Sequence, residues 1–371
     1  NLALSSLWDF HWDCLTLRFF QQGLRNTFSV RTEAGLPVEF SHLGQQKEFN
    51  MNMQNLVGVD THKDSLACYC NGKFKEFSTT KDGFIKAIKW ANSSNWAIEG
   101  AYCFGQAFSN FLIKNGCQVY EINPLLTKSW RAALKVSSPK NDYGDAKVIS
   151  IFANMDNMNK VSFETIKLKE KLTARKALIK QKTQITNHLK MLIYTRGEEL
   201  PFKALDTKKA LKWMIEQDDI IIQSNGKILE SILDGIKQIE VEIEKEMPEA
   251  AKALTKIEGI STITACTIYA ETKGKLTNKA QFASYCGVAP IDCSSGKTTR
   301  KRNNKGGNRI LNSIFYSLSI AQKRYNEKAK AYYEKKISEG KTPRHARKCL
   351  ARQLTNIVFR TLKNATEQGK P

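Results

Sequence analysis

The 371 residues can bury a sizeable core and form two or three domains, and the 41% hydrophobic content is that of a globular protein. The 58 Lys and Arg against 36 Asp and Glu give a formal net charge of +22, which indicates a polyanionic partner. No run of about 18 apolar residues is present to cross a membrane, so the charge favours nucleic acid. Nine Cys without a CxxC pair, and five scattered His, argue against a zinc site or a disulfide framework and predict a cytoplasmic protein.

Residues 1–50 differ from the rest of the chain. They carry five acids, four bases and no Met, whereas Met51 and Met53 stand just before the first apolar run. Their apolar residues lack the regular spacing of a membrane-surface helix. We expect either upstream sequence translated along with the gene or an extension without a catalytic role.

From Leu56 onward the sequence alternates between short strands and helices. The Asn71-Gly72 pair between two apolar runs is a strong hairpin signal. The predicted elements are, in order, a strand ending at Asp60, strands at 66–70 and 73–77, a helix at 82–92, a strand ending at Glu99, a helix at 104–114 and a strand at 118–122. This order is typical of an RNase H-like mixed α/β sheet.

Acidic residues follow two of these strands and begin a further element. Asp60 ends the apolar run in VGVDTHKDS, and Glu99 ends the one in NWAIEGAYCFG. Gly58 lets neighbouring backbone or substrate approach closely. PKNDYGDAKVIS places Asp142 and Asp145 three apart at an expected helix start, hence on one helical face. Each position alone has an ordinary explanation, because Asp favours turns and acids favour helix N-termini.

The three acidic positions, Asp60, Glu99 and the Asp142/Asp145 pair, together indicate a metal site. Four carboxylates that converge at one sheet edge repel one another unless divalent cations are bound. With no His or Cys nearby, such oxygen ligands suit Mg²⁺ or Mn²⁺. The sequence therefore predicts a two-metal site for phosphoryl transfer.

Residues 163–250 carry a different pattern, with apolar residues at helical spacing amid dense Lys, Glu and Gln. A second such run covers 220–247, and residues 197–201 interrupt the pattern between the two. This predicts long amphipathic helices, compatible with an antiparallel coiled coil. The pattern fits a helical bundle and a dimerising arm equally well.

Pro248 marks the next boundary. KIEGISTITACTIYAE, residues 256–271, pairs a glycine-containing turn with an apolar helix and resembles one helix-hairpin-helix unit, whose turn amides typically hold DNA phosphate. Glu258 and Ser261 stand where such turns commonly carry Pro and Gly. We therefore favour a packing turn over a DNA contact.

A polar loop and a strongly basic run come next. The loop places Ser294 and Ser295 before a glycine, which is by itself an ordinary arrangement. Between Asp292 and Glu327 there are eight Lys or Arg and no acid, enough to bind several phosphates. The residues expected to bind nucleic acid in this run are Lys297, Arg300, Lys301, Arg302, Lys305 and Arg309. A second acid-free basic segment, 341–363, has a helical pattern and extends this surface.

The acidic positions and the basic block together resemble the DEDD insertion-sequence transposases of the Piv-like (IS110) family. VGVDTHKD, IEG and KNDYGDA match the family's Asp-Glu-Asp-Asp tetrad. A second matching block runs from IEGIST through FASYCGVAPIDCSSGKTTRKRNNKGGNRIL, residues 257–311. The resemblance covers about residues 53–363.

The resemblance implies a RuvC-like domain in which the tetrad holds Mg²⁺, or Mn²⁺. It implies that Ser295, directly before a glycine, attacks a DNA phosphate to form a covalent phosphoserine link, with Ser294 as the shifted alternative. It further implies a homo-oligomer, a dimer or a tetramer, whose subunits bring serine and tetrad together. A structured non-coding bridge RNA would pair with donor and target DNA.

We therefore expect a cytoplasmic DNA transposase or recombinase with no membrane segment. Its expected parts are an N-terminal extension (1–50), a RuvC-like α/β catalytic domain (51–160), a helical or coiled-coil segment (161–248) and a mainly α-helical transposase domain with the serine and the basic surface (249–371). Two alternatives stay open. One is a RuvC-like structure-selective nuclease, in which the tetrad directs water and Ser295 is irrelevant, and the other is a catalytically inactive nucleic-acid-binding remnant.

Overall fold

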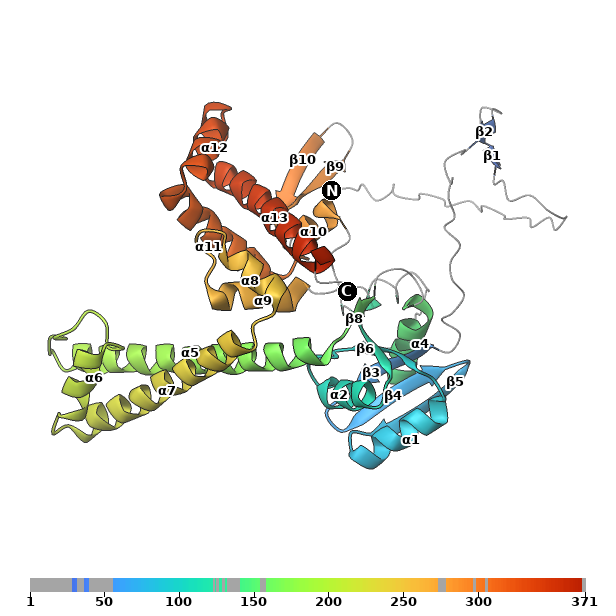
Figure 1. The fold of residues 1–371 in the computed structure, drawn as a ribbon, viewed down its shortest axis with the longest axis horizontal. Helices are drawn as coiled ribbons and strands as arrows, with labels where there is room; N and C mark the ends of the chain where they lie inside the picture. Colours follow the sequence, from blue (N-terminus) through green and yellow to red (C-terminus); the bar gives the residue numbers. More distant parts are fainter. Residues whose placement is uncertain are drawn as a thin grey trace, which may run out of the picture. The chain divides into compact units, whose positions relative to one another are not determined.

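The computed structural model describes residues 29–31, 37–39, 56–122, 124, 127–128, 131, 141–153, 158–272, 278–295, 298–303 and 306–368 (Figure 1). Contacts within the chain divide it into two compact units, Asn1–Asn52 and Met53–Pro371. The described part of the first unit is an antiparallel pair of strands, β1 (Ser29–Arg31) and β2 (Pro37–Glu39). The rest of the expected N-terminal extension lies outside the described residues.

The second unit begins with a six-stranded mixed sheet in the order β5-β4-β3-β6-β7-β8. Its strands are β3 (Leu56–Thr61), β4 (Ser65–Cys70), β5 (Lys73–Ser78), β6 (Asn95–Glu99), β7 (Gln118–Ile122) and β8 (Asn159–Lys160). Strands β3, β6 and β7 are parallel, whereas β4, β5 and β8 are antiparallel to their neighbours. This order confirms the predicted RNase H/RuvC-like fold. No sequence pattern predicts β8, because two residues carry no detectable alternation.

The hairpin of β4 and β5 turns at the predicted pair. Asn71 and Gly72 have φ angles of 48° and 81°, both in the left-handed region that a two-residue type I′ turn requires. Asn and Gly are the residues that adopt this conformation at least cost, which is why the turn is readable from the sequence.

Helices cover both faces of the sheet (Figure 1). On one face, α1 (Lys81–Ala91) and α2 (Gln106–Lys114) pack on a core that includes Val57, Val59, Trp96, Phe84 and Phe108. On the other face, α4 (Asp142–Phe152) packs on Leu56, Ala97 and Ile122. Burial on both faces explains why β3 reads as a continuous apolar run rather than an alternating one.

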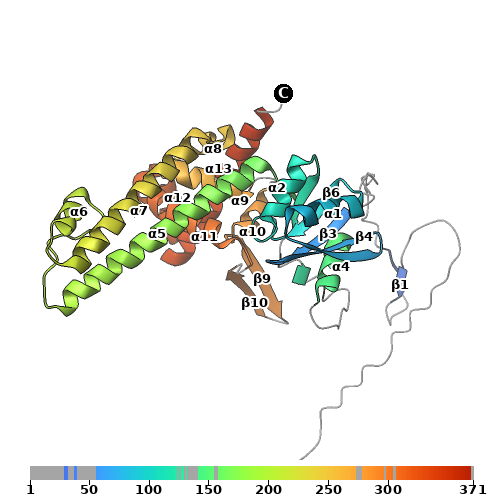
Figure 2. The ribbon, with the colours of Figure 1, turned by 90° about the horizontal axis from the view of Figure 1, so that it is seen from below.

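The predicted amphipathic helices form an antiparallel pair, α5 (Phe163–Thr195) and α7 (Ile220–Lys245), which run side by side in Figures 1 and 2. The predicted interruption at 197–201 follows the end of α5, and a short helix that was not predicted, α6 (Lys208–Ile215), comes after it and packs on α7. The apolar core at this end includes Leu189, Ile193, Leu211, Met214 and Leu229. Arg175 with Glu240 at 2.6 Å, and Lys171 with Glu246 at 2.8 Å, cross between the two long helices.

The last part of the chain is mainly helical, as predicted. It comprises α8 (Glu249–Thr255), α9 (Thr262–Thr272), α10 (Lys279–Tyr285), the antiparallel strands β9 (Pro290–Ser295) and β10 (Thr298–Asn303), α11 (Arg309–Tyr325), α12 (Glu327–Ser338) and α13 (Pro343–Gln368). Its core includes Phe282, Phe315, Leu350, Leu354 and Phe359. Among the described helices of the whole chain, none is long and apolar enough to span a membrane.

The turn between α8 and α9 packs on α11. Gly259 has a φ of 83°, and a Cβ there would press on Leu318. Gln322 donates a hydrogen bond to the carbonyl oxygen of Glu258, and Asn326 Nδ2 donates to the Glu258 carboxylate at 2.8 Å. Glu258, the residue that departs from a DNA-binding turn, therefore serves intramolecular packing, in agreement with the favoured interpretation.

Candidate metal centre

Asp60 and Glu99 lie at the ends of adjacent parallel strands, on the same face of the sheet: Asp60 is the second-last residue of β3 and Glu99 the last residue of β6. The register pairs Gly58 with Ala97 and Val59 with Ile98, so Asp60 comes next to Glu99. Side chains alternate between the two faces along a strand. Asp60 lies two residues after Gly58 and Glu99 two residues after Ala97, so both acids point to the same face as these paired residues. The hydroxyl of Thr61 also donates to the carbonyl oxygen of Glu99 at 2.8 Å, which ties the two strand ends together.

Gly58 lets α4 approach the sheet closely. A Cβ at this position would overlap the carbonyl oxygen of Ala146 and the amide nitrogen of Ser150, both in the backbone of α4. The hydroxyl of Ser150 in turn donates to the carbonyl oxygen of Leu56 at 3.1 Å. Because Gly58 and Asp60 lie on the same face, this contact places the helix over the strand that carries Asp60.

The first turn of α4 carries the other two acids, Asp142 and Asp145. Asn141 caps the helix, and its side chain accepts a hydrogen bond from a backbone amide of the first turn at 2.7 Å. Tyr143 packs edge-on against Tyr69 and Phe74, with ring centroids 5.8 Å and 5.3 Å away. The helix start is therefore anchored to strands β4 and β5 beside Asp60.

The negative charges of the other three carboxylates act on Asp60. The pKa of Asp60 is raised to about 6, chiefly by burial; His62 acts in the opposite direction, and the charges of Glu99, Asp145 and Asp142 add to the rise. The structure thus brings together all four acids that the sequence singled out. In the absence of a cation, this arrangement disfavours full ionisation.

An imidazole and a guanidinium enter this cluster, and the sequence analysis missed both. His62 Nε2 lies 3.5 Å from Asp60 Oδ2 and 3.2 Å from Asp142 Oδ1. Arg131 forms an ion pair with Asp145. The expectation of no nearby His was wrong: His62 follows Asp60 by two residues, a spacing that could have been noticed. Arg131 carries no such signal, because it stands 14 residues before its partner.

The donor atoms fit a divalent cation. One ligand atom each from Asp60, His62 and Asp142 lies within 4.8 Å of the other two, which is close enough to share one ion. Glu99 comes next to Asp60 in the strand register, and Asp145 shares the first turn of α4 with Asp142, but neither belongs to this group of three. The group thus contains two of the four predicted carboxylates and, in addition, a ring nitrogen.

Ser295 lies at the end of a strand, which corrects the expected polar loop. Ser295 pairs with Thr298 as the final pair of the β9–β10 hairpin, and Ser294 pairs with Thr299. The loop interpretation was wrong because residues 290–295 pair with residues 298–303 as antiparallel strands. The connecting residue Gly296 lies outside the described residues.

The basic run is spread over several elements. Arg300, Lys301 and Arg302 belong to β10, and Arg309 is the first residue of α11. Positions 297 and 305 lie outside the described residues. The segment 341–363, predicted as a basic helix, falls almost wholly within α13.

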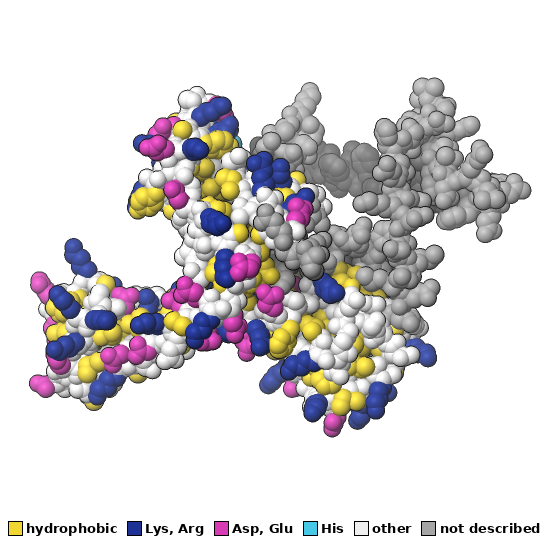
Figure 3. Space-filling view, viewed as in Figure 1, with side chains coloured by type: hydrophobic (Ala, Val, Ile, Leu, Met, Phe, Trp, Pro, Cys, Tyr) yellow, Lys and Arg dark blue, Asp and Glu magenta, His cyan; other side chains and the backbone are white. Residues whose placement is uncertain are grey.

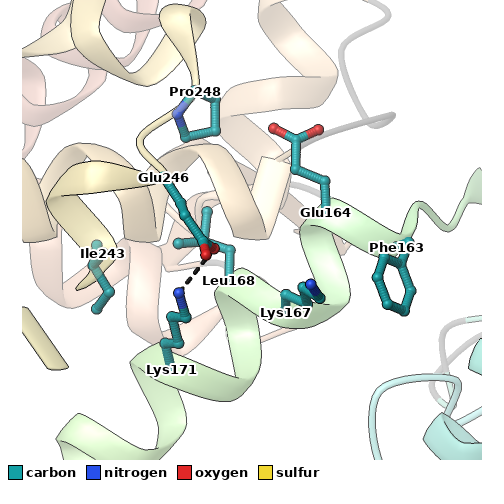
Figure 4. Close-up of a pocket in the computed structure, with 8 residues that line it drawn as sticks. All are labelled: Phe163, Glu164, Lys167, Leu168, Lys171, Ile243, Glu246 and Pro248. Carbon is teal, nitrogen blue, oxygen red and sulfur yellow. Dashed lines mark ion pairs between the residues drawn. The ribbon is translucent and has the colours of Figure 1, made fainter.

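A separate cavity of about 300 Å³ lies between the first turns of α5 and the junction of α7 with α8 (Figure 4). Its lining includes the apolar Leu168 and Ile243 and the charged Lys167, Lys171 and Glu246. Lys171 and Glu246 point toward each other there as an ion pair. None of the four acids of the sheet edge lines this cavity, so it is distinct from the metal centre.

The strand order and the carboxylate cluster define a RuvC-like domain followed by a helical region. A transposase family model of the IS110 DEDD type matches residues 57–194, and one described as the transposase IS116/IS110/IS902 family matches residues 251–334. Together they match more than half of the chain. The chain belongs to the IS116/IS110/IS902 family of transposases.

Two similar proteins illustrate this relationship. The chain is 28% identical over 171 residues to the insertion element IS110 uncharacterized 43.6 kDa protein of Streptomyces coelicolor, a match that covers 44% of this chain and 42% of that protein. The match thus spans less than half the length of this relative. The RuvC structure of Thermus thermophilus matches with 15% identity and a TM-score of 0.22 over 29% of this chain and 99% of that one. At that score the fold assignment rests on the strand order.

Proposed function

We propose that this protein is a DNA transposase or site-specific recombinase that cuts and rejoins DNA for an insertion sequence. The observation that carries the proposal is the convergence of Asp60, Glu99 and the first turn of α4 at one edge of the sheet. Family membership and the net charge of +22 support it. The activity, the DNA substrate and the partners are all part of this proposal.

In this proposal, Asp60, Glu99, Asp142 and Asp145 hold Mg²⁺ or Mn²⁺. When bound, such cations neutralise the charge of the reacting phosphate and assist deprotonation of the attacking oxygen. The buried carboxyl of Asp60, whose pKa is raised by burial, gains most from a cation because its ionised form is otherwise disfavoured. Arg131 neutralises Asp145 in the metal-free protein.

Ser295 is the proposed nucleophile. Its hydroxyl oxygen attacks phosphorus in the DNA backbone, a new serine–phosphate bond forms, and the phosphorus–oxygen bond to one deoxyribose breaks. The hydroxyl proton passes to an assisting base, and the departing sugar oxygen takes up a proton. A serine hydroxyl is a weak nucleophile at neutral pH, so it needs this assistance and the nearby positive charge of β10.

The proposed partners are donor and target DNA, a structured non-coding bridge RNA and further copies of the chain in a dimer or tetramer. Basic side chains suited to polyanions appear on the sheet domain, the long helices and the C-terminal helices (Figure 3). Exposed apolar side chains at the end of the α5–α7 pair, Met191, Tyr194 and Ile220, support self-association. The bridge RNA rests on the family resemblance and on the charge alone.

A gel assay for protein covalently attached to cleaved DNA tests this function. Wild-type protein with Mg²⁺ should form the adduct, Ser295→Ala should abolish both adduct and recombination, and Ser294→Ala should retain at least part of both. Asp60→Asn should lower cleavage by about a thousandfold or more, since bound metal supplies several kcal/mol of transition-state stabilisation.

The same assay distinguishes the alternatives. Cleavage without an adduct would identify a water-directed nuclease, and binding without cleavage would identify an inactive remnant. Full recombination by Ser295→Ala would rule out the phosphoserine mechanism.

A further inference from the structure

His62 is fixed at the entrance of the metal centre by the tight connection between β3 and β4. Thr61 and Leu66 form the last strand pair, and the backbone amide of His62 donates to the carbonyl oxygen of Ser65 at 2.9 Å. The strand end therefore limits how far the imidazole can move. Asp60, two residues earlier, is held by the same strand.

The ring nitrogen Nε2 of His62 faces two carboxylates without an ordinary hydrogen bond. It is shielded from solvent and makes no hydrogen bond to any described residue, although Asp60 Oδ2 and Asp142 Oδ1 lie 3.5 Å and 3.2 Å away. An imidazole lone pair and two anionic oxygens around one point repel one another unless they share a cation. Strand β3 with the residue that follows it, and helix α4, thus present three donor atoms to one position.

We infer that His62 is a nitrogen ligand of the metal centre, together with Asp60 and Asp142. This inference rests on the proposed function, because it takes the carboxylate cluster to be a metal site. Imidazole is a poor ligand for Mg²⁺, which demands oxygen donors, and a better one for first-row transition metals. The ring nitrogen therefore shifts the centre from Mg²⁺ toward Mn²⁺, compared with a site of carboxylates alone.

Electron paramagnetic resonance of Mn²⁺ added to the full-length, DNA-free protein tests the inference directly. The pulsed spectrum of wild-type protein should show coupling to a coordinated imidazole nitrogen. His62→Gln should lose this coupling, whereas His188→Gln, the same substitution at an exposed position of α5, should keep it. A wild-type Mn²⁺ complex without nitrogen coupling would overturn the assignment.

Binding affinities give a second, independent readout. His62→Gln should weaken Mn²⁺ binding by about tenfold or more, and Mg²⁺ binding, measured by competition, by only about twofold. If the imidazole instead occupies the metal position as a positively charged competitor, His62→Gln would bind Mn²⁺ more tightly than wild type. That result would also overturn the inference.

Asp60→Asn separates this inference from the proposed function. Loss of a carboxylate ligand should weaken Mn²⁺ and Mg²⁺ alike. If Asp60→Asn leaves both affinities unchanged, the metal centre itself is wrong. If it weakens both while the wild-type complex shows no nitrogen coupling, the centre stands and the role of His62 is wrong.

Discussion

The candidate metal centre and the β9–β10 hairpin differ in how much of the surrounding structure supports them. Asp60 and Glu99 lie at the ends of strands that have neighbouring strands on both sides and helices on both faces. Asp142 and Asp145 belong to a helix whose backbone touches one of those strands. Ser295, by contrast, ends a strand whose described sheet contains one other strand, β10. A two-stranded hairpin alone is only marginally stable in water, so its order depends on what else it contacts.

The two regions therefore differ in which residues are held rigidly. The carboxylates are fixed by the core of the sheet domain, which under the proposed function lowers the cost of binding cations and phosphate. The proposed nucleophile is carried by a local element rich in positive charge, where phosphate contacts can add the missing stabilisation. Under the proposed function, the metal centre is already formed, and contacts with nucleic acid stabilise the hairpin that carries Ser295.

The largest expected effect on stability concerns the repulsion between the clustered carboxylates. It tests whether Arg131 offsets this repulsion in the metal-free protein. Arg131→Gln removes the partner of Asp145 in a pair whose side chains are 18% and 6% exposed. An unpaired buried charge should lower the free energy of unfolding by about 3 kcal/mol, measured by denaturant titration in EDTA. Saturating Mg²⁺ should restore part of this loss, because the cation replaces the missing positive charge.

The matched control breaks a more exposed pair in the α5–α6 region. Lys182 and Asp206 lie 2.9 Å apart with side chains 27% and 36% exposed, so Lys182→Gln should cost about 1 kcal/mol or less, with no effect of Mg²⁺. Equal losses in both variants would mean that Asp145 is not part of a strained charge cluster.

The next effect is a pH dependence that arises from Asp60. Its pKa is raised from 3.8 to about 6 in the folded protein, so the folded state binds more protons than the unfolded state between these values. The contribution to stability is therefore fully present below about pH 4 and is lost as the pH rises through 6. The loss should approach about 3 kcal/mol in metal-free protein.

Unfolding measured in EDTA between pH 4 and 7 checks this sign. Asp60→Asn should be more stable than wild type at pH 7 and nearly equal to it at pH 4. Asp64→Asn, at an exposed acid of the same connection, should follow the wild-type profile. A wild-type protein that becomes more stable relative to Asp60→Asn as the pH rises would contradict the assigned cause.

The sequence predicted the parts of the centre that depend on local pattern. Asp60 and Glu99 follow apolar runs that read as strands, and the Asn71-Gly72 turn fixes which strands pair. The parallel register of β3 and β6 then follows from the fold, and it sets the two acids side by side. The apolar runs, the turn signal and the strand order of one fold were therefore sufficient to predict that these acids lie near one another.

The sequence could not predict the contacts that depend on tertiary packing. The ion pair of Arg131 with Asp145 joins residues 14 apart in the sequence, a contact that no periodicity encodes. The direction of the His62 ring depends on the turn after β3. Gly58 was interpreted correctly as a point of close approach, but only the structure identifies the approaching backbone as that of α4.

A smaller effect tests the contact that holds α4 over the metal centre. Gly58→Ala adds a methyl group that overlaps the backbone of α4 at Ala146 and Ser150, so the helix must shift. The overpacking should cost about 1 to 3 kcal/mol of stability and should weaken Mn²⁺ binding, because Asp142 moves with the helix. Calorimetry and Mn²⁺ titration measure the two effects.

Gly235→Ala serves as the matched control in α7. A Cβ there meets only a side-chain methyl of Leu178 at 3.3 Å, and alanine favours a helix interior over glycine by about 0.5 to 1 kcal/mol. This variant should be as stable as wild type or more so, with unchanged Mn²⁺ binding. Unchanged metal binding by Gly58→Ala would show that the helix position does not set the site.

The smallest expected effect per residue concerns the basic strand of the hairpin. Replacing Arg300, Lys301 and Arg302 together by Gln removes three positive charges from β10. Each lost phosphate contact should reduce the slope of log affinity against log salt by about 1, with similar weakening for all DNA sequences. The control removes the same charge from α5 by replacing Lys176, Lys180 and Lys190, which are exposed there. If both triple variants change the slope equally, binding depends on net charge alone. The basic residues of β10 then have no special role in binding phosphate beside Ser295.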